Sequence, residues 1–308
     1  MSKLDNWLIE NWHVVFTALI CFAIANIVRA RVMKSNRTVS NTGRREKSRR
    51  DSGCEKTPDQ VADLDGDEDD HNTNASDSGS EIQSALPKDL KHIPFKYNKP
   101  SKEKSIERAN EFYNCMNARR TIRHFSSEPV PQEIIHSIIK TAGTSPSGAH
   151  TEPWMYVVVS NLEMKRKIRK IVEEEELINY TRRMGIKWTT DLKPLKTNWV
   201  KEYLTDAPYL ILVFKQMYSF KDDGTKKVHY YNEISVSIAA GFLLAAIHYA
   251  GLVSLTSTPL NCGPALRALL GRPTYEKLML LLPVGYPSDG ALVPDLQRKP
   301  LQEIMIEI

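Results

Sequence analysis

The chain has 308 residues, which is enough for one sizeable domain with appendages. Hydrophobic residues make up 41% and charged residues 26%, as in an ordinary globular protein. The formal net charge of +5 is mild, and the sequence contains neither zinc-finger spacing nor interleaved aromatic and basic residues. These features give no support for nucleic-acid binding, and they leave small anionic molecules as candidate partners.

The four cysteines are widely separated and contain no CxxC pair; they are Cys21, Cys54, Cys115 and Cys262. A zinc site needs close pairs, and a disulfide scaffold needs dense spacing in a short secreted chain. We therefore interpret all four as reduced thiols without a catalytic role, and we predict no metal site.

An uncharged apolar run extends from Val14 to Val28 and is followed by a basic cluster that begins at Arg29. With the flanking tryptophans it reaches the roughly 17–20 residues that a bilayer span needs. A cleaved signal peptide is the alternative, but it carries its basic residues before the apolar run. We therefore expect a tail at 1–12 and an uncleaved anchor at 13–30, with the rest of the chain cytoplasmic by the positive-inside rule.

Residues 31–90 contain few apolar side chains and carry their charges in blocks, basic around Arg44 and acidic from Asp63 to Asp70. Such a stretch cannot bury enough apolar surface to offset the entropy lost on ordering, so we expect a disordered linker. The basic block is equally compatible with contact to anionic lipid and with a solvated spacer. Asn74 fits the glycosylation pattern but would stay unmodified in the cytoplasm.

Residues 91–308 alternate between helical and strand-like patterns. Apolar spacing predicts one helix around 106–116 and a second between Pro131 and Gly143. The charged stretch 163–183 is either a long polar helix or a mobile lid, and the nearly all-apolar stretch 234–250 predicts a helix buried in the core. Short apolar runs predict buried strands at 154–159, 208–214, 252–256 and 278–284. Together these elements predict an α+β sandwich.

Three clusters carry polar chemistry. Arg119–Phe125 (RRTIRHF) places three guanidiniums beside a hydroxyl, which suits a phosphate monoester, although a solvated basic turn fits about equally well. Ser145–Trp154 combines small residues with two prolines before a strand, which lets backbone N–H groups approach a planar ligand. Thr256–Asn261 places three hydroxyls at a strand end, where a capped turn would be the simpler explanation if the cluster stood alone.

A fourth set suits an amino-acid zwitterion, which needs an acceptor for its ammonium and a cation for its carboxylate. Glu176 and Lys201 supply one of each, and Tyr180 lies four residues after Glu176 on the same helical face. The charge run Glu173–Glu176 would by itself favour a solvated helix face.

Taken together, these clusters resemble the nitroreductase superfamily of FMN enzymes, and RRTIRHF is similar to its flavin-phosphate motif. The resemblance narrows to the iodotyrosine deiodinase family and covers the chain from about His92 to its end. It is carried by PSGAHTEPW, EEEELINYTRRMG, TNWVKEYL, KVHYYNEISVSIA, TSTPLNCGP and VPDLQRKPL. An amino-terminal anchor with a variable linker is typical of its animal members. The resemblance implies a nitroreductase-like FMN-binding sandwich that forms a homodimer.

The resemblance also implies roles for individual residues. Thr256 is the catalytic candidate, because its hydroxyl would donate toward flavin N5. Pro146–Gly148 would reach the flavin from the partner subunit, and the Ala149 N–H would meet the substrate phenolate. The zwitterion would be held by Glu176, Tyr180 and Lys201. FMN would be bound by Arg119, Arg120, Thr121, Ile122, Arg123, Pro146, Ser147, Gly148, Thr256, Ser257, Thr258 and Arg298.

The implied activity is reductive dehalogenation of mono- and diiodotyrosine to tyrosine and halide, with FMN as cofactor. The electrons would come ultimately from NADPH, directly or through a reductase, and the chain has no dinucleotide-binding GxGxxG of its own. One alternative is a broad nitro- or quinone reductase, for which the lid residues would be dispensable. The other is a membrane protein that binds flavin or ligand without turnover.

Overall fold

A computed structural model of the chain describes residues 84, 86, 87 and 89–308. All of them belong to one structural unit, Ser78–Ile308. The predicted anchor at 13–30 and nearly all of the predicted linker at 31–90 lie outside the described residues, so both stay predictions.

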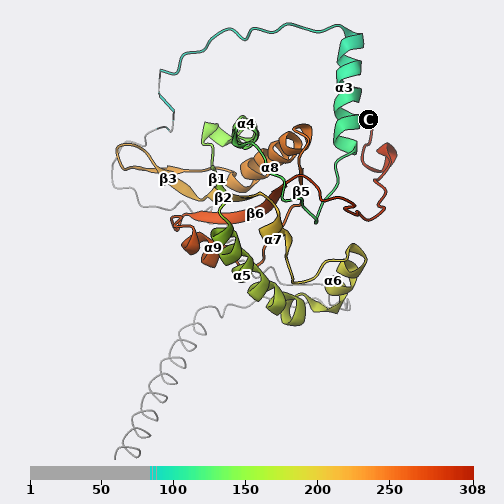
Figure 1. The fold of residues 1–308 in the computed structure, drawn as a ribbon. Coiled ribbons are helices and arrows are strands. Elements are labelled where there is room, and N and C mark those ends of the chain that lie inside the picture. Colours follow the sequence, from blue (N-terminus) through green and yellow to red (C-terminus); the bar gives the residue numbers. More distant parts are fainter. Residues whose placement is uncertain (1–83, 85, 88) are drawn as a thin grey trace, which may run out of the picture. The chain divides into compact units, whose positions relative to one another are not determined.

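A four-stranded antiparallel sheet forms the centre of this unit (Figure 1). In spatial order its strands are β1 (Trp154–Val159), β2 (Tyr209–Gln216), β6 (Glu276–Gly285) and β5 (Val253–Ser254). All four predicted strands are confirmed, although β5 is shorter than the predicted 252–256. The run Leu210–Lys215 of β2 is buried throughout, because helices cover the sheet on both faces. This explains why the strand reads as an unbroken apolar stretch rather than an alternating one.

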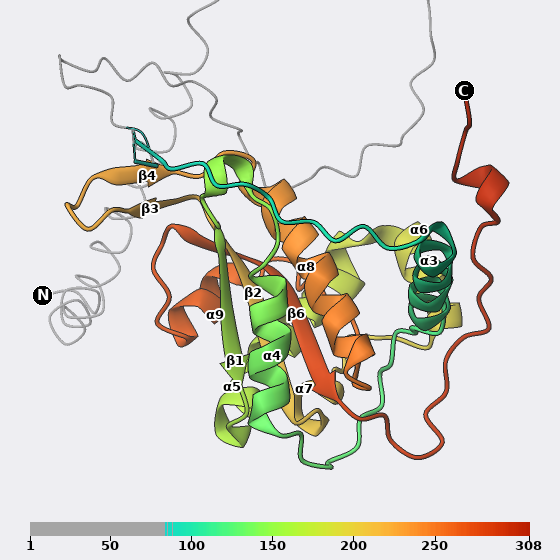
Figure 2. The same ribbon diagram turned by 90° about the horizontal axis from the view of Figure 1, so that it is seen from above.

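Alternate residues of β2 build two separate cores. Leu212 and Phe214 pack on one face with helices α5 (Leu162–Ile178), α7 (Tyr203–Asp206) and α9 (Gly263–Leu269). Ile211 and Val213 pack on the other face with α4 (Gln132–Ala142) and α8 (Asn232–Tyr249). Figures 1 and 2 show the sheet between these two helical layers. The predicted α+β sandwich is confirmed.

The charged stretch 163–183 forms a helix rather than an irregular lid. The Asn161 side chain begins α5 by accepting a hydrogen bond from the Met164 N–H at 2.9 Å, and Ile168 and Val172 pack into the core. Past Ile178 the chain continues as the π-helix η2 (Asn179–Arg183) and then as α6 (Gly185–Leu192).

The first predicted helix is α3 (Lys102–Asn117), and it lies at one edge of the unit (Figure 2). Ser101 caps its amino terminus by accepting from the Lys104 N–H. None of its residues is buried, and the side chains of Ile106, Phe112 and Tyr113 are more than half exposed. This helix therefore presents an apolar side that the described part of the chain leaves exposed.

The predicted core helix α8 is buried on one face only. Val236 and Leu243 on one face are fully buried, whereas Ile238 and Phe242 on the other are each 41% exposed. Both faces are apolar, so the sequence contains no stripe to tell them apart. Length and composition alone would also allow α8 to cross a membrane, but its inner face packs on the sheet and α4.

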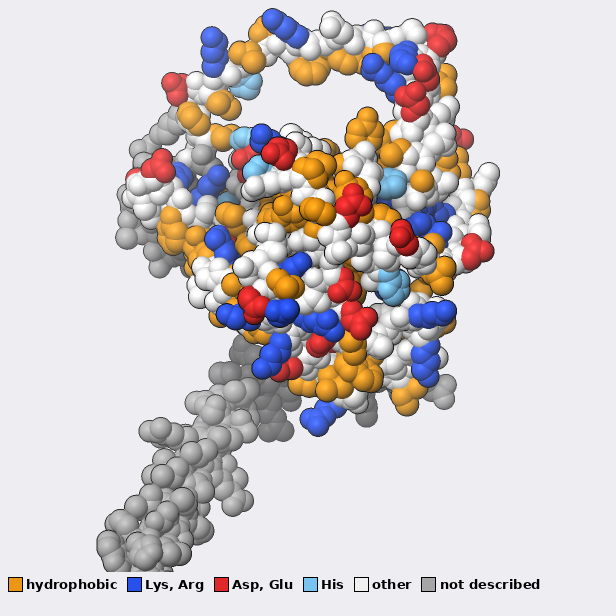
Figure 3. Space-filling view, viewed as in Figure 1, with side chains coloured by type: hydrophobic (Ala, Val, Ile, Leu, Met, Phe, Trp, Pro, Cys, Tyr) orange, Lys and Arg blue, Asp and Glu red, His pale blue; other side chains and the backbone are white. Residues whose placement is uncertain are grey.

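The outer face of α8 forms an apolar groove of about 1220 Å³ with α3 and α4. Figure 3 shows hydrophobic side chains gathered over α4 and α8. The groove is lined by Phe112, Met116, Ile134, Ile138, Ile238, Gly241, Phe242, Ala245 and Tyr249, among others. Exposed apolar residues gathered in one place are a feature of interaction surfaces.

Several short elements were not predicted. They are the hairpin β3 (Tyr218–Phe220) and β4 (Lys226–Val228), the helices α6, α7 and α9, the π-helix η2, and the 3₁₀ turns η1 (Gly148–His150), η3 (Lys193–Leu195) and η4 (Leu301–Glu303). They are too short to show a period of 2 or 3.6 residues above the noise of the sequence.

Candidate active site

The arginine cluster joins the end of α3 to the sheet. Thr121 forms a parallel bridge with Ser254 of β5, and the Ile122 N–H donates to the Ser254 carbonyl at 3.2 Å. The Ile122 side chain belongs to the buried core. These contacts hold Arg119 and Arg120 at the edge of the sheet, both half-buried.

The carboxyl-terminal tail adds a third guanidinium to this edge. Arg298 Nη2 donates to the Arg119 carbonyl at 2.8 Å, and Arg120 Nη2 donates to the Pro294 carbonyl. Nearly 180 residues separate the paired groups in the chain. Of the four arginines predicted to bind the phosphate, Arg119, Arg120 and Arg298 are therefore brought together, with Arg298 still exposed to solvent. Arg123 is the fourth, and these contacts do not include it.

The residues predicted to bind a zwitterion also come together in one place. Lys201 Nζ lies 3.1 Å from Glu176 Oε2, and the two side chains are only 7% and 14% exposed. The same ammonium lies 5.2 Å from the centre of the Tyr180 ring, which packs edge-on against Trp199. Burying such a pair costs desolvation energy that its own attraction barely repays, so stability gives little reason to keep it. A zwitterion that entered between the two charges would meet one partner for each.

Arg123 lies within electrostatic reach of Tyr180 and Tyr203. Burial raises the pKa of the Tyr180 phenol, and the nearby Arg123 guanidinium offsets part of that rise. Burial likewise raises the pKa of Tyr203 well above its usual value, again with Arg123 acting in the opposite direction. The three arginines of RRTIRHF therefore differ in their surroundings, because Arg119 and Arg120 contact the carboxyl-terminal tail.

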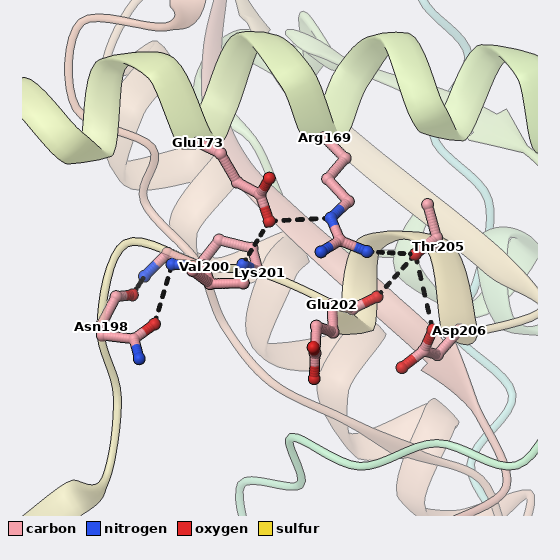
Figure 4. A network of polar contacts seen from close by, with 8 residues as sticks. All are labelled: Arg169, Glu173, Asn198, Val200, Lys201, Glu202, Thr205 and Asp206. Atoms are coloured by element: carbon pink, nitrogen blue, oxygen red, sulfur yellow. Dashed lines mark hydrogen bonds and ion pairs between the residues drawn. The ribbon is translucent and has the colours of Figure 1, made fainter.

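The charge run Glu173–Glu176 is not one solvated face. Glu174 has a side-chain exposure of 66% and Glu176 of 14%, because successive helical residues point about 100° apart. Glu173 accepts from Arg169 Nε at 2.8 Å and from the Lys201 backbone N–H at 2.7 Å (Figure 4). The Glu176 carboxylate therefore contacts the Lys201 side chain, and the Glu173 carboxylate contacts the Lys201 backbone.

Sequence reasoning missed the support around Lys201. Arg169 also donates to Thr205 Oγ1 at 2.8 Å, so it joins α5 to the start of α7 (Figure 4). Lys201 Nζ donates to the Asn198 carbonyl at 2.5 Å. The (i, i+4) spacing of Arg169 and Glu173 signals an ion pair, but no pattern in the sequence indicates its contact with residue 201.

The loop before β1 stores backbone strain. Ala149, His150 and Glu152 have φ values of 50°, 53° and 50°, a left-handed conformation that residues other than glycine rarely adopt. Ser147 Oγ accepts from the Glu152 N–H at 3.0 Å and helps to hold it. A Cβ at Gly148 would lie 3.1 Å from the Tyr230 carbonyl oxygen, so a side chain there would press on the backbone before α8. Strain of this kind clusters at ligand-binding sites.

This loop and the arginine cluster lie at opposite ends of α8. Gly148 contacts Tyr230 and Tyr231, which precede the helix, whereas Arg119 and Arg120 line a small pocket with residues such as Ile247 near its end. Sixteen residues of helical rise put these ends about 24 Å apart. Within one chain, Pro146–Ala149 therefore do not meet the arginines with which they were predicted to bind FMN.

The hydroxyls of the Thr256–Asn261 cluster divide between two sides. The Ser257 side chain is hydrogen-bonded to the Tyr203 phenol, and its backbone pairs with Leu281. Thr256 and Thr258 on either side of it are exposed. Because neighbours in an extended chain point to opposite faces, Thr256 and Thr258 present the two free-standing hydroxyls, while Ser257 anchors the segment.

The chemistry of these residues fits FMN. Three guanidiniums suit its phosphate, the Gly148 loop permits close approach of a flat ring, and Thr256 and Thr258 offer donors to a ring edge. Burial raises the pKa of the Cys262 thiol to about 12, which disfavours the reactive thiolate. Among the described residues, no group of His, Cys, Asp and Glu side chains could hold a metal ion.

Known proteins share this sequence and this fold. Residues 116–286 match the nitroreductase family. A solved structure of iodotyrosine deiodinase bound to FMN and 3-iodo-L-tyrosine is 32% identical, with a TM-score of 0.54 over 62% of this chain and 96% of that one. A BluB-like flavoprotein from Clostridium difficile 630, 21% identical with a TM-score of 0.51 over 63% of this chain and 97% of its own, shares the fold alone.

Curated relatives are much more similar. The iodotyrosine deiodinase of Daphnia pulex is 65% identical over 224 residues, which is 73% of this chain and 75% of that protein. Iodotyrosine deiodinase 1 of Homo sapiens is 62% identical over 219 residues, or 71% of this chain and 76% of that protein. The chain therefore belongs to the nitroreductase family and, within it, to the iodotyrosine deiodinases.

Proposed function

We propose that the chain removes iodide reductively from mono- and diiodotyrosine, with FMN as its cofactor. The observation that carries this proposal is the buried group of Glu176, Tyr180 and Lys201, since a nitro or quinone substrate has no zwitterion to fill it. When bound and reduced, FMN would supply two electrons, which with one proton convert the C–I bond to a C–H bond and release iodide, leaving oxidised FMN. The likeness to a solved structure of iodotyrosine deiodinase and to the iodotyrosine deiodinase of Daphnia pulex supports the assignment.

The substrate roles follow from the charges. Glu176 accepts from the ammonium of the substrate, while Lys201 and Tyr180 bind its carboxylate, so the ion pair opens and both partners keep a counter-charge. Ala149, exposed in the strained loop, offers its N–H to the phenolate oxygen. Thr256 donates toward flavin N5, with Thr258 beside it. Closing the site only around a zwitterion couples specificity to catalysis.

The active site is proposed to lie between two copies of the chain. The distance along α8 supports this, because a second chain can bring its Pro146–Ala149 loop to the first chain's arginines. The apolar groove along α8 supports it as well, and so do extended terminal segments with uncovered apolar residues. These residues include Ile93, Phe95, Tyr97, Leu292, Leu296 and Ile306.

Two further proposals rest on the sequence. The order of apolar run and basic cluster supports an uncleaved single-pass anchor at 13–30, a linker at 31–90 and a cytoplasmic catalytic domain at 91–308. The electrons are proposed to come ultimately from NADPH, directly or through a reductase. This supply would not use a GxGxxG dinucleotide-binding motif, because the sequence contains none.

Substrate preference distinguishes the proposed deiodinase from a broad nitro- or quinone reductase, which would not need a zwitterion on its substrate. With dithionite as reductant, we expect the FMN-loaded protein to release iodide from diiodotyrosine with a kcat/KM about 100-fold or more above that for 2-iodophenol. Two charge-assisted contacts of about 1.5–3 kcal/mol each account for the difference. Iodide release is followed with an ion-selective electrode. Equal kcat/KM for both compounds, or nitroaromatic turnover with no iodide release, would favour the alternative.

A further inference from the structure

We propose that Asn179 is a positioning residue that ties the zwitterion site to the segment facing the flavin; this inference rests on the proposed function. Its side chain is fully buried although it is polar. Asn179 Nδ2 donates to Glu176 Oε1 at 3.2 Å and to the Leu260 carbonyl at 3.2 Å. Leu260 lies two residues after Thr258, in the cluster that carries the free-standing hydroxyls.

Both the nitrogen and the oxygen of the Asn179 side-chain amide have hydrogen-bond partners. Its Oδ1 accepts from Arg183 Nη1 at 3.0 Å, while its two N–H bonds point at Glu176 and Leu260. Turning the amide over would set its oxygen against a carboxylate and a carbonyl, so only one orientation satisfies the group. A buried network in which every member is satisfied holds one geometry in preference to others.

Asn179 lies at the junction of α5 and the π-helix η2. The i→i+5 pattern of this π-helix is closed by the Met184 N–H, which donates to the Asn179 carbonyl at 2.9 Å. Asn179 and Tyr180 lie three and four residues after Glu176, and helical spacing places both on the side of its carboxylate. Asn179 points at Leu260, and Tyr180 lies against the Lys201 ammonium. Single π-turns inside helices are frequent at functional sites.

The consequence is that the Glu176 carboxylate is fixed through both oxygens. Oε2 faces Lys201 Nζ at 3.1 Å and Oε1 accepts from Asn179. Through Leu260, Asn179 therefore sets the distance between the substrate ammonium and the segment that carries Thr256 and Thr258. A change in this distance misaligns the Glu176 carboxylate with the substrate ammonium, so it weakens the binding of substrates that carry a zwitterion.

The test uses Asn179→Asp in the FMN-loaded full-length protein with dithionite. Aspartate keeps the shape but replaces both donors with acceptors that repel Glu176 and the Leu260 carbonyl. We expect the KM for diiodotyrosine to rise about 10- to 100-fold, because a charge-assisted contact is misaligned. The kcat/KM for 2-iodophenol, which has no zwitterion, stays within about twofold of wild type. FMN content and thermal midpoint serve as checks on the fold.

Two companion variants make the result decisive. Asn179→Ser keeps one donor and should fall between wild type and Asn179→Asp, and it replaces the aspartate variant if that protein does not fold. Arg182→Ala, an exposed change in the same π-helix, should leave both substrates unaffected. An unchanged KM in Asn179→Asp and Asn179→Ser, or an equal loss for both substrates, overturns the inference. A wild type that releases no iodide would instead overturn the proposed function.

Discussion

Replacing Lys201 with alanine raises the KM for diiodotyrosine about 10- to 100-fold. The ammonium is buried, and it is the cation that the substrate carboxylate needs, so its loss removes a charge-assisted contact of about 1.5–3 kcal/mol. It also leaves Glu176 without its counter-charge. We expect FMN content to stay at the wild-type level, because Lys201 lies in the zwitterion site and not among Arg119, Arg120 and Arg298.

Iodide release at varied diiodotyrosine concentration, with dithionite as reductant, measures this effect. Lys193→Ala is the matched control, since it removes an exposed lysine from the same segment. Glu176→Gln should give a smaller rise in KM than Lys201→Ala, because glutamine still offers an oxygen to the ammonium. For 2-iodophenol the variants should match wild type. Wild-type apparent affinity for diiodotyrosine in both Lys201→Ala and Glu176→Gln would rule out the zwitterion role.

Ile238→Glu converts the protein to a monomer that retains little FMN. Ile238 lies in the apolar groove and is 41% exposed, so the chain can accommodate glutamate without burying it. In the proposed dimer the carboxylate would be buried in an apolar interface, at a cost of several kcal/mol that a homodimer carries twice. The loss of FMN follows because the partner's Pro146–Gly148 loop no longer reaches the arginines.

Sedimentation velocity gives the assembly state, and flavin absorbance of the purified protein gives the FMN content. Leu162→Glu is the matched control, because Leu162 at the start of α5 is similarly exposed, at 44%, on the opposite helical layer. We expect this control to stay dimeric and yellow. A dimeric Ile238→Glu variant with full FMN content would exclude the α8 groove as the interface.

The sheet could be predicted because its strands are apolar runs bounded by polar or turn residues. Trp154–Val159 and Leu210–Phe214 are continuous enough to be strands whichever way the chain folds around them. The burial of α8 could not be predicted, since Val236 and Ile238 look alike in the sequence. Only their neighbours decide that one faces the core and the other the groove.

The sequence could likewise predict only part of the candidate site. The charges of Glu176 and Lys201 suggest a zwitterion partner. The family resemblance is needed to select Glu176 from a run of four glutamates. The contact of Glu173 with the Lys201 backbone crosses 28 positions of sequence and has no local signal. The left-handed Ala149 and His150 were equally hidden, because local propensity disfavours that conformation and tertiary contacts impose it.

One anaerobic experiment tests the central claim most directly. The FMN-loaded protein is reduced with one equivalent of dithionite, and the flavin absorbance near 450 nm is followed after diiodotyrosine or tyrosine is added. Our account predicts that diiodotyrosine restores the oxidised spectrum with release of iodide, whereas tyrosine leaves the protein reduced. Reduced protein that stays bleached with diiodotyrosine would contradict it, and would identify the chain as a flavin-binding protein without this turnover.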